Sequence, residues 1–198
     1  MCALRVLSVL CMVQLCCAVA WADDLVMPEP GKKVKVFVLA GQSNMEGRAD
    51  GTKVLPQDKV RLAAVQDRVQ LAFNYQPIRP LDVVKAHRSI AKSYKIDTLF
   101  GPELSFGIGM AEAWTEEQIL LIKVSTGSTS LYGCWNSEWS LAKATLMEEA
   151  EEPPLYSAMI KYVHEVLSGY DAEQYTLCGM LWVQGETDSG TKVAAAEY

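Results

Sequence analysis

Three stretches of the chain are dominated by hydrophobic residues and predict buried strands. They cover residues 34–40, 118–124 and 175–183. Runs of this length that are rich in Val, Ile and Leu are typical of strands that are buried on both faces of a parallel sheet. A shorter run at residues 69–75 predicts a further strand.

Helical patterns separate these strands. Pro102 and Glu103 suit the first turn of a helix, because proline needs no hydrogen bond there and an acidic side chain favours the positive end of the helix dipole. Residues 155–167 carry one apolar stripe that ends before Gly169. Residues 76–100 contain two prolines and no clear period, and they predict a long irregular loop. Strands that alternate with helices predict one α/β domain with a parallel sheet and right-handed crossovers.

The first 22 residues predict a signal peptide rather than part of this domain. Arg5 is their one charged residue, an apolar run covers residues 6–20, and residues 20–22 have the small-x-small pattern of a cleavage site. The alternative is a membrane anchor, but the apolar run is short for a spanning helix and Asp23 follows at once. We therefore expect a secreted or periplasmic protein with a domain at residues 23–198 and no stable membrane anchor.

Composition narrows the range of functions further. The net charge is −6 and no basic block stands out, which argues against nucleic acid as a partner. No Cys/His spacing suits zinc and no dinucleotide-binding fingerprint follows a strand, so we expect no metal and no cofactor. Beyond the signal region there are two cysteines, Cys134 and Cys178, which either form a disulfide or are two buried thiols.

Polar, glycine-bearing segments follow three of the predicted strands. They cover residues 41–44, 125–130 and 184–188. A parallel sheet brings the carboxyl ends of its strands to one edge, where ligands bind. Each segment alone would be ordinary turn chemistry, but three together can supply a serine nucleophile, N–H donors for an oxyanion, and a carboxylate that orients a histidine. The pattern therefore favours a serine esterase.

Four sequence blocks resemble the sialate O-acetylesterase and carbohydrate esterase family 6 branch of the SGNH hydrolases. They lie at residues 41–48 (GQSNMEGR), 100–107 (FGPELSFG), 123–131 (KVSTGSTSL) and 182–188 (WVQGETD), in the order of the family. The resemblance covers about residues 34–190. It implies a flavodoxin-like three-layer α/β/α sandwich that hydrolyses O-acetyl esters of carbohydrates, such as acetylated xylan or sialic acid.

The resemblance also assigns roles to single residues. It implies Ser43 as the nucleophile and Glu186 as a candidate acid of the triad. The oxyanion hole would consist of the Ser43 N–H, the Gly127 N–H and the side chain of Gln184. Because residues 126–128 read Thr-Gly-Ser where many relatives carry Gly-Gly-Thr, Gly127 departs in part from the family pattern.

Further residues are candidates for the edge that receives the substrate. Asn44 adjoins Ser43, and Asp188 follows the same strand as Glu186 and is an alternative partner for a histidine. Trp135 lies beyond the glycine block and is a candidate for stacking on a sugar ring, although core packing is the commoner fate of tryptophan.

The catalytic base is missing from the pattern. The family carries a histidine in a late Asp-x-x-His block, whereas this chain has only His87, in the loop predicted at 76–100, and His164, on the polar side of a helix. We therefore expect a domain that is incomplete at its C-terminus, with little activity of its own. The alternative is a relative that binds carbohydrate without catalysis.

Overall fold

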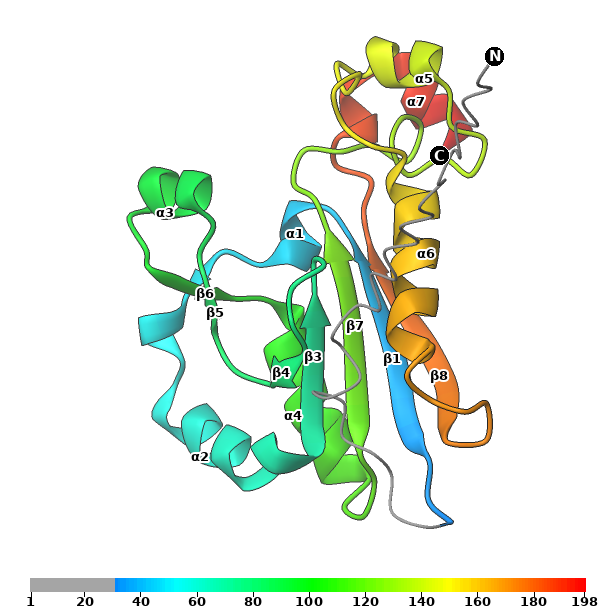
Figure 1. The fold of residues 1–198 in the computed structure, drawn as a ribbon. Helices are drawn as coiled ribbons and strands as arrows, with labels where there is room; N and C mark the ends of the chain where they lie inside the picture. The colour runs from blue at the N-terminus through cyan, green and yellow to red at the C-terminus, as the bar shows by residue number, and fades with distance from the viewer. Residues whose placement is uncertain (1–30) are drawn as a thin grey trace, which may run out of the picture.

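The computed structural model describes residues 31–198, which are built around a five-stranded sheet (Figure 1). The strand order is β4-β3-β7-β1-β8, and every pairing is parallel except that of β3 with β4. Its strands are β1 (Val34–Gly41), β3 (Val69–Phe73), β4 (Arg79–Pro80), β7 (Ile119–Ser125) and β8 (Tyr175–Val183). The four strands expected from the sequence are confirmed. The expected signal peptide lies outside the described residues.

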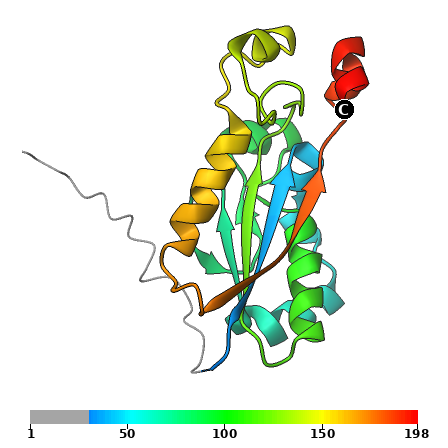
Figure 2. The same ribbon diagram turned by 90° about the vertical axis from the view of Figure 1, so that its right-hand side faces the viewer.

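Helices cover both faces of this sheet and make three layers (Figure 2). The helices α2 (Pro56–Val65) and α4 (Pro102–Ala113) lie on one face, and α6 (Leu155–Leu167) lies on the other. Alternate side chains of β1 point to the two faces, so that Phe37 packs with α4 and Val36 packs with α6. The expected α/β/α architecture with a mostly parallel sheet is confirmed.

The loop predicted at residues 76–100 is instead largely ordered secondary structure, so that prediction was wrong. The strands β2 (Ala49–Asp50), β5 (Val84–Lys85) and β6 (Thr98–Phe100) form a small antiparallel sheet in the order β2-β6-β5. The helix α3 (Arg88–Tyr94) connects β5 with β6. We call residues 84–100 the arm; it projects beside the main sheet (Figure 1). Strands of two or three residues are too short to show an alternating pattern. They are stabilised by the strands with which they pair rather than by a pattern in their own sequence.

The last strand of the sheet, β8, is exposed on both faces. It pairs with β1 on one side, and within residues 31–198 no strand covers its other side. Leu177 is 56% exposed and Met180 is 49% exposed. Cys178 is exposed as well, against the expectation of a buried thiol, while Cys134 is buried; both are free cysteines, so the disulfide is not formed.

Shorter helices complete the described part of the chain. They are α1 (Ser43–Glu46), α5 (Leu141–Leu146) and α7 (Lys192–Glu197). The loops that carry α5 and α7 lie beyond the carboxyl ends of the strands (Figure 1). Among residues 31–198, none of the helices has the length and apolar character needed to cross a membrane.

Candidate active site

The sheet brings the three polar segments to one edge, as the sequence predicts. Gly41 at the end of β1 is in register with Ser125 of β7 on one side and with Val183 of β8 on the other. Backbone hydrogen bonds continue this pairing past the strand ends, because Gln42 N donates to Val183 O at 3.1 Å and Thr126 N donates to Gly41 O at 3.1 Å. The segments that begin with Gln42, Thr126 and Gln184 therefore start side by side.

Ser43 is presented by a sharp turn out of β1. Gly41 has φ 148°, and a Cβ atom there would lie 1.9 Å from the carbonyl oxygen of Val183, so the turn requires glycine. The helix α1 begins directly at Ser43. The Ser43 side chain is half-buried and lines a cavity of about 400 Å³, and its hydroxyl has no hydrogen-bond partner among the described residues. Ser43 is thus free to act on a group bound in this cavity.

A buried ion pair supports α1 from beneath. Lys123 of β7 and Glu103 of α4 are paired, and each side chain is 1% exposed. Lys123 Nζ also donates to the carbonyl oxygen of Glu46, the last residue of α1, at 2.9 Å, and Glu103 Oε1 accepts the N–H of Gly101 at 2.9 Å. Burial lowers the pKa of Lys123, and the charge of Glu103 opposes that effect. The pair fixes the position of the helix that carries Ser43.

Glu186 lies next to the segment that carries the serine. Asn44 Nδ2 donates a hydrogen bond to Glu186 Oε1, and both residues are exposed. Gln42 makes a second link that sequence reasoning missed: its buried side-chain oxygen accepts the hydroxyl of Thr187 at 2.9 Å. The only signal for this role in the sequence was a polar residue between Gly41 and the serine. These bonds connect the segment after β8 to the segment after β1.

The side-chain amide of Gln184 is bonded to the loop after β7 and to its own loop. Its Nε2 donates to the carbonyl oxygen of Thr129 at 2.9 Å and to Asp188 Oδ2 at 2.8 Å. Both amide hydrogens are therefore used within the protein, and the oxyanion role of Gln184 stays a prediction.

Asp188 is buried instead of lining the substrate edge, so that expectation is corrected. It is 1% exposed, and its carboxylate accepts the N–H groups of Leu131 and Tyr132 at 2.9 Å each. A carboxylate that accepts several N–H groups can stay charged inside a protein. Asp188 thereby ties the segment after β8 to the loop that follows β7.

Trp135 is also not a surface residue, and its expected role as a sugar platform is wrong. It is 1% exposed, its indole N–H donates to Thr129 Oγ1 at 2.9 Å, and its ring packs edge-to-face on Trp182 with 5.2 Å between centroids. Burial of the large ring with its N–H paired is the more favourable arrangement.

Gly127 lies at the carboxyl edge of the sheet, close to the guanidinium group of Arg48. A Cβ atom at Gly127 would be 2.2 Å from Arg48 Nη2, so the guanidinium packs directly against the glycine. Two hydrogen bonds to Glu46 Oε2 hold Arg48 there, one from Nη2 at 3.0 Å and one from Nε at 3.1 Å. A third runs from Arg48 Nη1 to the hydroxyl of Tyr94 at 2.8 Å. Burial works to lower the pKa of Arg48, but these hydrogen bonds outweigh it and raise the pKa. Whether the Gly127 N–H stabilises an oxyanion stays a prediction.

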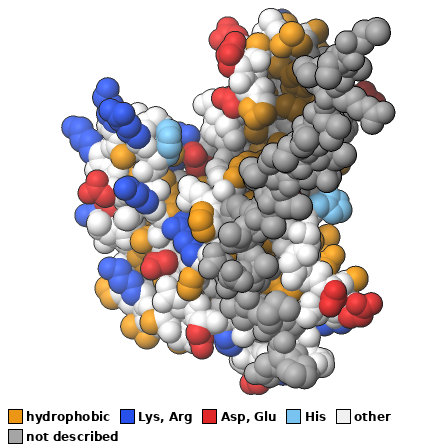
Figure 3. All heavy atoms as spheres, viewed as in Figure 1, with side chains coloured by type: hydrophobic (Ala, Val, Ile, Leu, Met, Phe, Trp, Pro, Cys, Tyr) orange, Lys and Arg blue, Asp and Glu red, His pale blue; other side chains and the backbone are white. Residues whose placement is uncertain are grey.

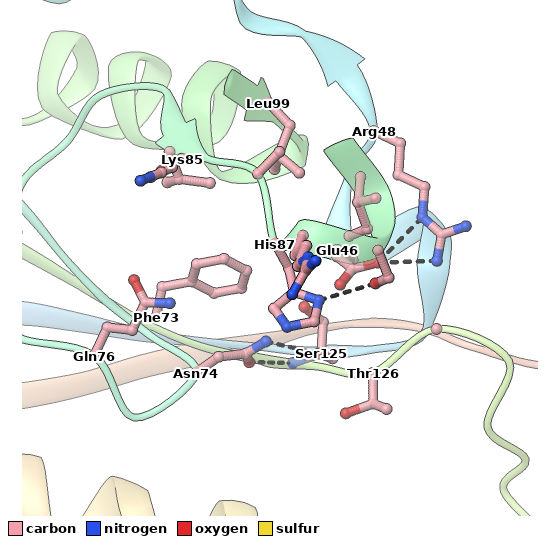
Figure 4. A pocket seen from close by; sticks show the side chains of 16 residues that line it. Glu46, Arg48, Phe73, Asn74, Gln76, Lys85, His87, Leu99, Ser125 and Thr126 are labelled. Carbon is pink, nitrogen blue, oxygen red and sulfur yellow. Dashed lines mark hydrogen bonds and ion pairs between the residues drawn. The ribbon is translucent and has the colours of Figure 1, made fainter. Parts of the chain in front are cut away.

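A second, larger cavity of about 660 Å³ adjoins the first (Figure 4). Its floor is formed by the ends of β3 and β7, including Asn74 and Ser125, and one wall is formed by the arm, including His87. Arg48 lines both cavities.

Neither histidine is bonded to the candidate nucleophile. The Nδ1 of His87 pairs with Ser89 Oγ at 2.9 Å, and His164 is exposed on α6 as expected. In the described part of the chain, no group of three or more His, Cys, Asp or Glu residues could hold a metal ion.

Comparison with known proteins is consistent with this geometry. The family model described as "carbohydrate esterase, sialic acid-specific acetylesterase" matches residues 33–198. A comparison with curated protein sequences gave no significant match.

Three solved structures are similar to this chain, and the one with a TM-score above 0.5 shares its fold. The crystal structure of NanS is 18% identical with a TM-score of 0.52, and the match covers 85% of this chain and 57% of NanS. A protein of Arabidopsis thaliana is 19% identical with a TM-score of 0.48, covering 79% of this chain and 59% of that one. A carbohydrate acetylesterase of Xanthomonas citri is 19% identical with a TM-score of 0.48, covering 83% of this chain and 35% of that one. The chain thus spans less than two thirds of the length of each.

Proposed function

Because the chain belongs to the sialic acid-specific acetylesterase family of carbohydrate esterases, we propose that it removes O-acetyl groups from carbohydrates through an acyl-enzyme formed on Ser43. The observation that carries this proposal is the placement of Ser43. Its hydroxyl has no hydrogen-bond partner within residues 31–198 and lines a cavity at the carboxyl edge of the sheet, between the polar segments that follow β7 and β8. That position is where a parallel α/β fold binds its ligand.

In the proposed reaction, Ser43 Oγ attacks the acetyl carbonyl carbon while a base takes its proton. The carbonyl oxygen becomes an oxyanion, for which the N–H groups of Ser43 and Gly127 are the proposed donors. Collapse of this intermediate breaks the bond to the sugar oxygen, which leaves with the proton returned by the base. A water molecule then attacks the acetyl-serine by the same route and releases acetate.

The proposed reaction also needs a catalytic base. Glu186, fixed by Asn44 beside the serine, is proposed to orient a histidine. Neither His87 nor His164 makes a hydrogen bond to Glu186 or Ser43 within residues 31–198. We therefore propose that a histidine outside this chain supplies the base, and that the 198-residue chain alone hydrolyses esters slowly at best. Loss of a triad member leaves roughly 10³–10⁴-fold catalysis over water in the best-studied serine hydrolase.

The test is hydrolysis of p-nitrophenyl acetate and release of acetate from acetylated sugars. We expect little turnover by the 198-residue chain, and full turnover by a longer form that carries the late histidine block. In that longer form Ser43→Ala should abolish turnover. Ser137→Ala, at an exposed serine in the loop after β7, is the matched control and should leave it unchanged.

Three outcomes would contradict the proposal. Undiminished hydrolysis by Ser43→Ala would remove the nucleophile. Rapid hydrolysis by the 198-residue chain that is lost in His87→Ala would make His87 the base. If the longer form binds acetylated carbohydrate but hydrolyses none, the protein is a binding relative of these esterases.

A further inference from the structure

The guanidinium group of Arg48 lies close to both residues whose backbone N–H groups are the proposed oxyanion donors. Arg48 and Ser43 line the smaller cavity together, and Arg48 and Gly127 line the larger one. Nη2 of Arg48 is packed so closely against Gly127 that a Cβ atom there would lie 2.2 Å from it. Among the described residues that line these two cavities, Arg48 is the only arginine or lysine common to both.

Three hydrogen bonds hold this guanidinium group in one orientation. Nε and Nη2 both donate to Glu46 Oε2, and Nη1 donates to the hydroxyl of Tyr94. The ring of Tyr94 also lies against the cation, with 5.3 Å between Arg48 Cζ and the ring centroid. A guanidinium group has five N–H bonds, so one on Nη1 and one on Nη2 have no partner within residues 31–198. Donors that are fixed in this way need no reorganisation when charge develops on a substrate.

The side chain expected to complete the oxyanion hole is bonded elsewhere. Gln184 Nε2 donates to Thr129 and to Asp188, which uses both of its N–H bonds. The hole would then contain the backbone N–H groups of Ser43 and Gly127 and no donor from a side chain. Arg48 is placed to supply that third donor, because it packs against Gly127 and lines the cavity of Ser43.

The arm adds positive charge on the same side of the site. Lys and Arg side chains gather on this projection in the space-filling view (Figure 3). The arm carries four basic residues and one acidic residue, which are Lys85, Arg88, Lys92, Lys95 and Asp97. Lys85 and Arg88 line the larger cavity together with Arg48. A cleft bordered by charges of one sign favours the opposite charge inside it, so a negative oxyanion is favoured at this edge.

We propose that Arg48 is a catalytic residue, whose Nη2 donates a hydrogen bond to the acetyl carbonyl oxygen during attack by Ser43. As the bond from Ser43 Oγ to the carbonyl carbon forms, the π electron pair of the carbonyl moves onto its oxygen. Arg48 stabilises the resulting anion together with the N–H groups of Ser43 and Gly127, and it keeps its own proton, because arginine is not deprotonated in proteins. The role in ester cleavage rests on the proposed function, whereas stabilisation of a negative tetrahedral group on Ser43 is measurable without cleavage.

The first test uses methylboronic acid and the 198-residue chain. Addition of Ser43 Oγ to boron forms a tetrahedral anion that resembles the acetyl intermediate, and the serine proton passes to the buffer, so no histidine is required. Boron NMR should show a tetrahedral signal that is absent in Ser43→Ala. Arg48→Met with Glu46→Gln should bind at least about tenfold more weakly, because a hydrogen bond to a charged group is lost. The second substitution is included so that no unpaired Glu46 carboxylate repels the anion.

The matched control is Arg61→Met with Glu112→Gln. Arg61 donates from Nε and Nη2 to Glu112 and from Nη1 to Asp58, which is the same pattern of bonds that holds Arg48. Because Arg61 lies on α2 and lines neither cavity, the control should not change the affinity for methylboronic acid. Circular dichroism verifies that each variant is folded. Arg48→Lys keeps a positive charge without the fork of N–H donors, so its affinity should be intermediate, and it provides the same test if the methionine variant is unstable.

The second test follows hydrolysis of p-nitrophenyl acetate by the longer form described above. Arg48→Met with Glu46→Gln should lower kcat about 10²–10³-fold, the usual effect of removing one oxyanion donor. KM should change little, because the donor acts on charge that develops only in the transition state. Arg61→Met with Glu112→Gln should leave both constants unchanged.

Several results would overturn the proposal. These are absence of a tetrahedral adduct in the unaltered chain, unchanged affinity in the Arg48 variants, or equal losses in the Arg48 and Arg61 variants. The two tests together separate this proposal from the proposed function. If the adduct depends on Arg48 but no form of the protein hydrolyses acetyl esters, the anion site at Arg48 stands and the esterase function fails. If the longer form hydrolyses esters equally well with and without Arg48, the esterase function stands and the catalytic role of Arg48 fails.

Discussion

The strands β1 and β8 are neighbours that are both mainly hydrophobic but lie in opposite environments. Both are parallel, mainly hydrophobic, and followed by a polar segment of the candidate site. Seven of the eight residues of β1 are buried, whereas none of the nine residues of β8 is. The difference lies in the neighbours: β1 is paired on both sides, while β8 is paired on one side in the described structure. Hydrophobic composition therefore predicts a strand, but its place in the sheet decides its burial.

The two strands also hold their functional segments by different means. The segment after β1 rests on the buried pair of Lys123 and Glu103. The segment after β8 is held through loop contacts, in which Asp188 accepts N–H groups from the loop after β7. One half of the site is thus supported by charge in the core, and the other by hydrogen bonds between loops. Three sets of substitutions test this contrast.

The largest effect is expected at Lys123. Lys123→Met leaves the Glu103 carboxylate buried without its partner, and removing one member of a buried ion pair costs about 3–5 kcal/mol. We expect a loss of that size in the free energy of unfolding, measured by urea denaturation. The double variant Lys123→Met with Glu103→Gln should regain much of it, because no unpaired charge is left.

The control for this prediction is a lysine in a surface ion pair. The side chain of Lys161 is 79% exposed, and its Nζ lies 3.7 Å from Oε1 of Glu165, one turn along α6. Because exposed ion pairs contribute little, Lys161→Met should change the free energy of unfolding little. Equal effects at Lys123 and Lys161 would show that the buried pair does not support the site.

A smaller effect is expected at Asp188. Asp188→Asn replaces one of the two accepting oxygens with an amide that faces a backbone N–H, so one of the two part-buried N–H groups loses its acceptor. The expected loss is about 1–3 kcal/mol, visible as a lower midpoint of thermal unfolding. Asp171→Asn changes the same group at an exposed position and should have almost no effect. If the two variants melt alike, Asp188 does not tie the loops together.

The smallest effect on stability is expected on β8 itself. Leu177→Lys with Met180→Lys should change the free energy of unfolding by no more than about 0.5 kcal/mol, because both side chains are largely exposed. Light scattering should show less self-association, since charges blunt an exposed edge strand. Val60→Lys, at a residue of α2 that is 71% exposed, is the control and should not reduce association. A loss of 2 kcal/mol or more on β8 would mean that its faces are buried in solution.

Local patterns of hydrophobic and polar residues were sufficient to predict most of the fold. The main strands and the helices α4 and α6 were predicted because each is long enough for its hydrophobic residues to show a pattern within its own sequence. The arm was missed because its strands are two or three residues long. The helix α3 is also short, at seven residues. Elements of that size are stabilised by pairing with distant segments.

For the candidate site, the sequence located the segments but not the side-chain environments. The positions of Ser43 and Gly127 at the carboxyl edge follow from strand order and direction alone. The burial of Trp135 and Asp188 does not, because it depends on loops that fold back over the strand ends. Gln184 is a similar case, since its amide is engaged by a residue 55 positions earlier.

The amino-acid sequence by itself determined the α/β pattern, the edge at which the polar segments meet, and the serine placed there, because these depend on periodicity within short stretches and on the direction of parallel strands. Only the tertiary structure decided which polar side chains are buried and which cations face a cavity. Lys123 stands in a hydrophobic strand and is stable there because Glu103, 20 positions away on α4, lies against it. Lys85 and Arg88 line a cavity because the arm folds back beside the ends of β3 and β7. Burial and charge are set by neighbours in space, and those neighbours are distant in the chain.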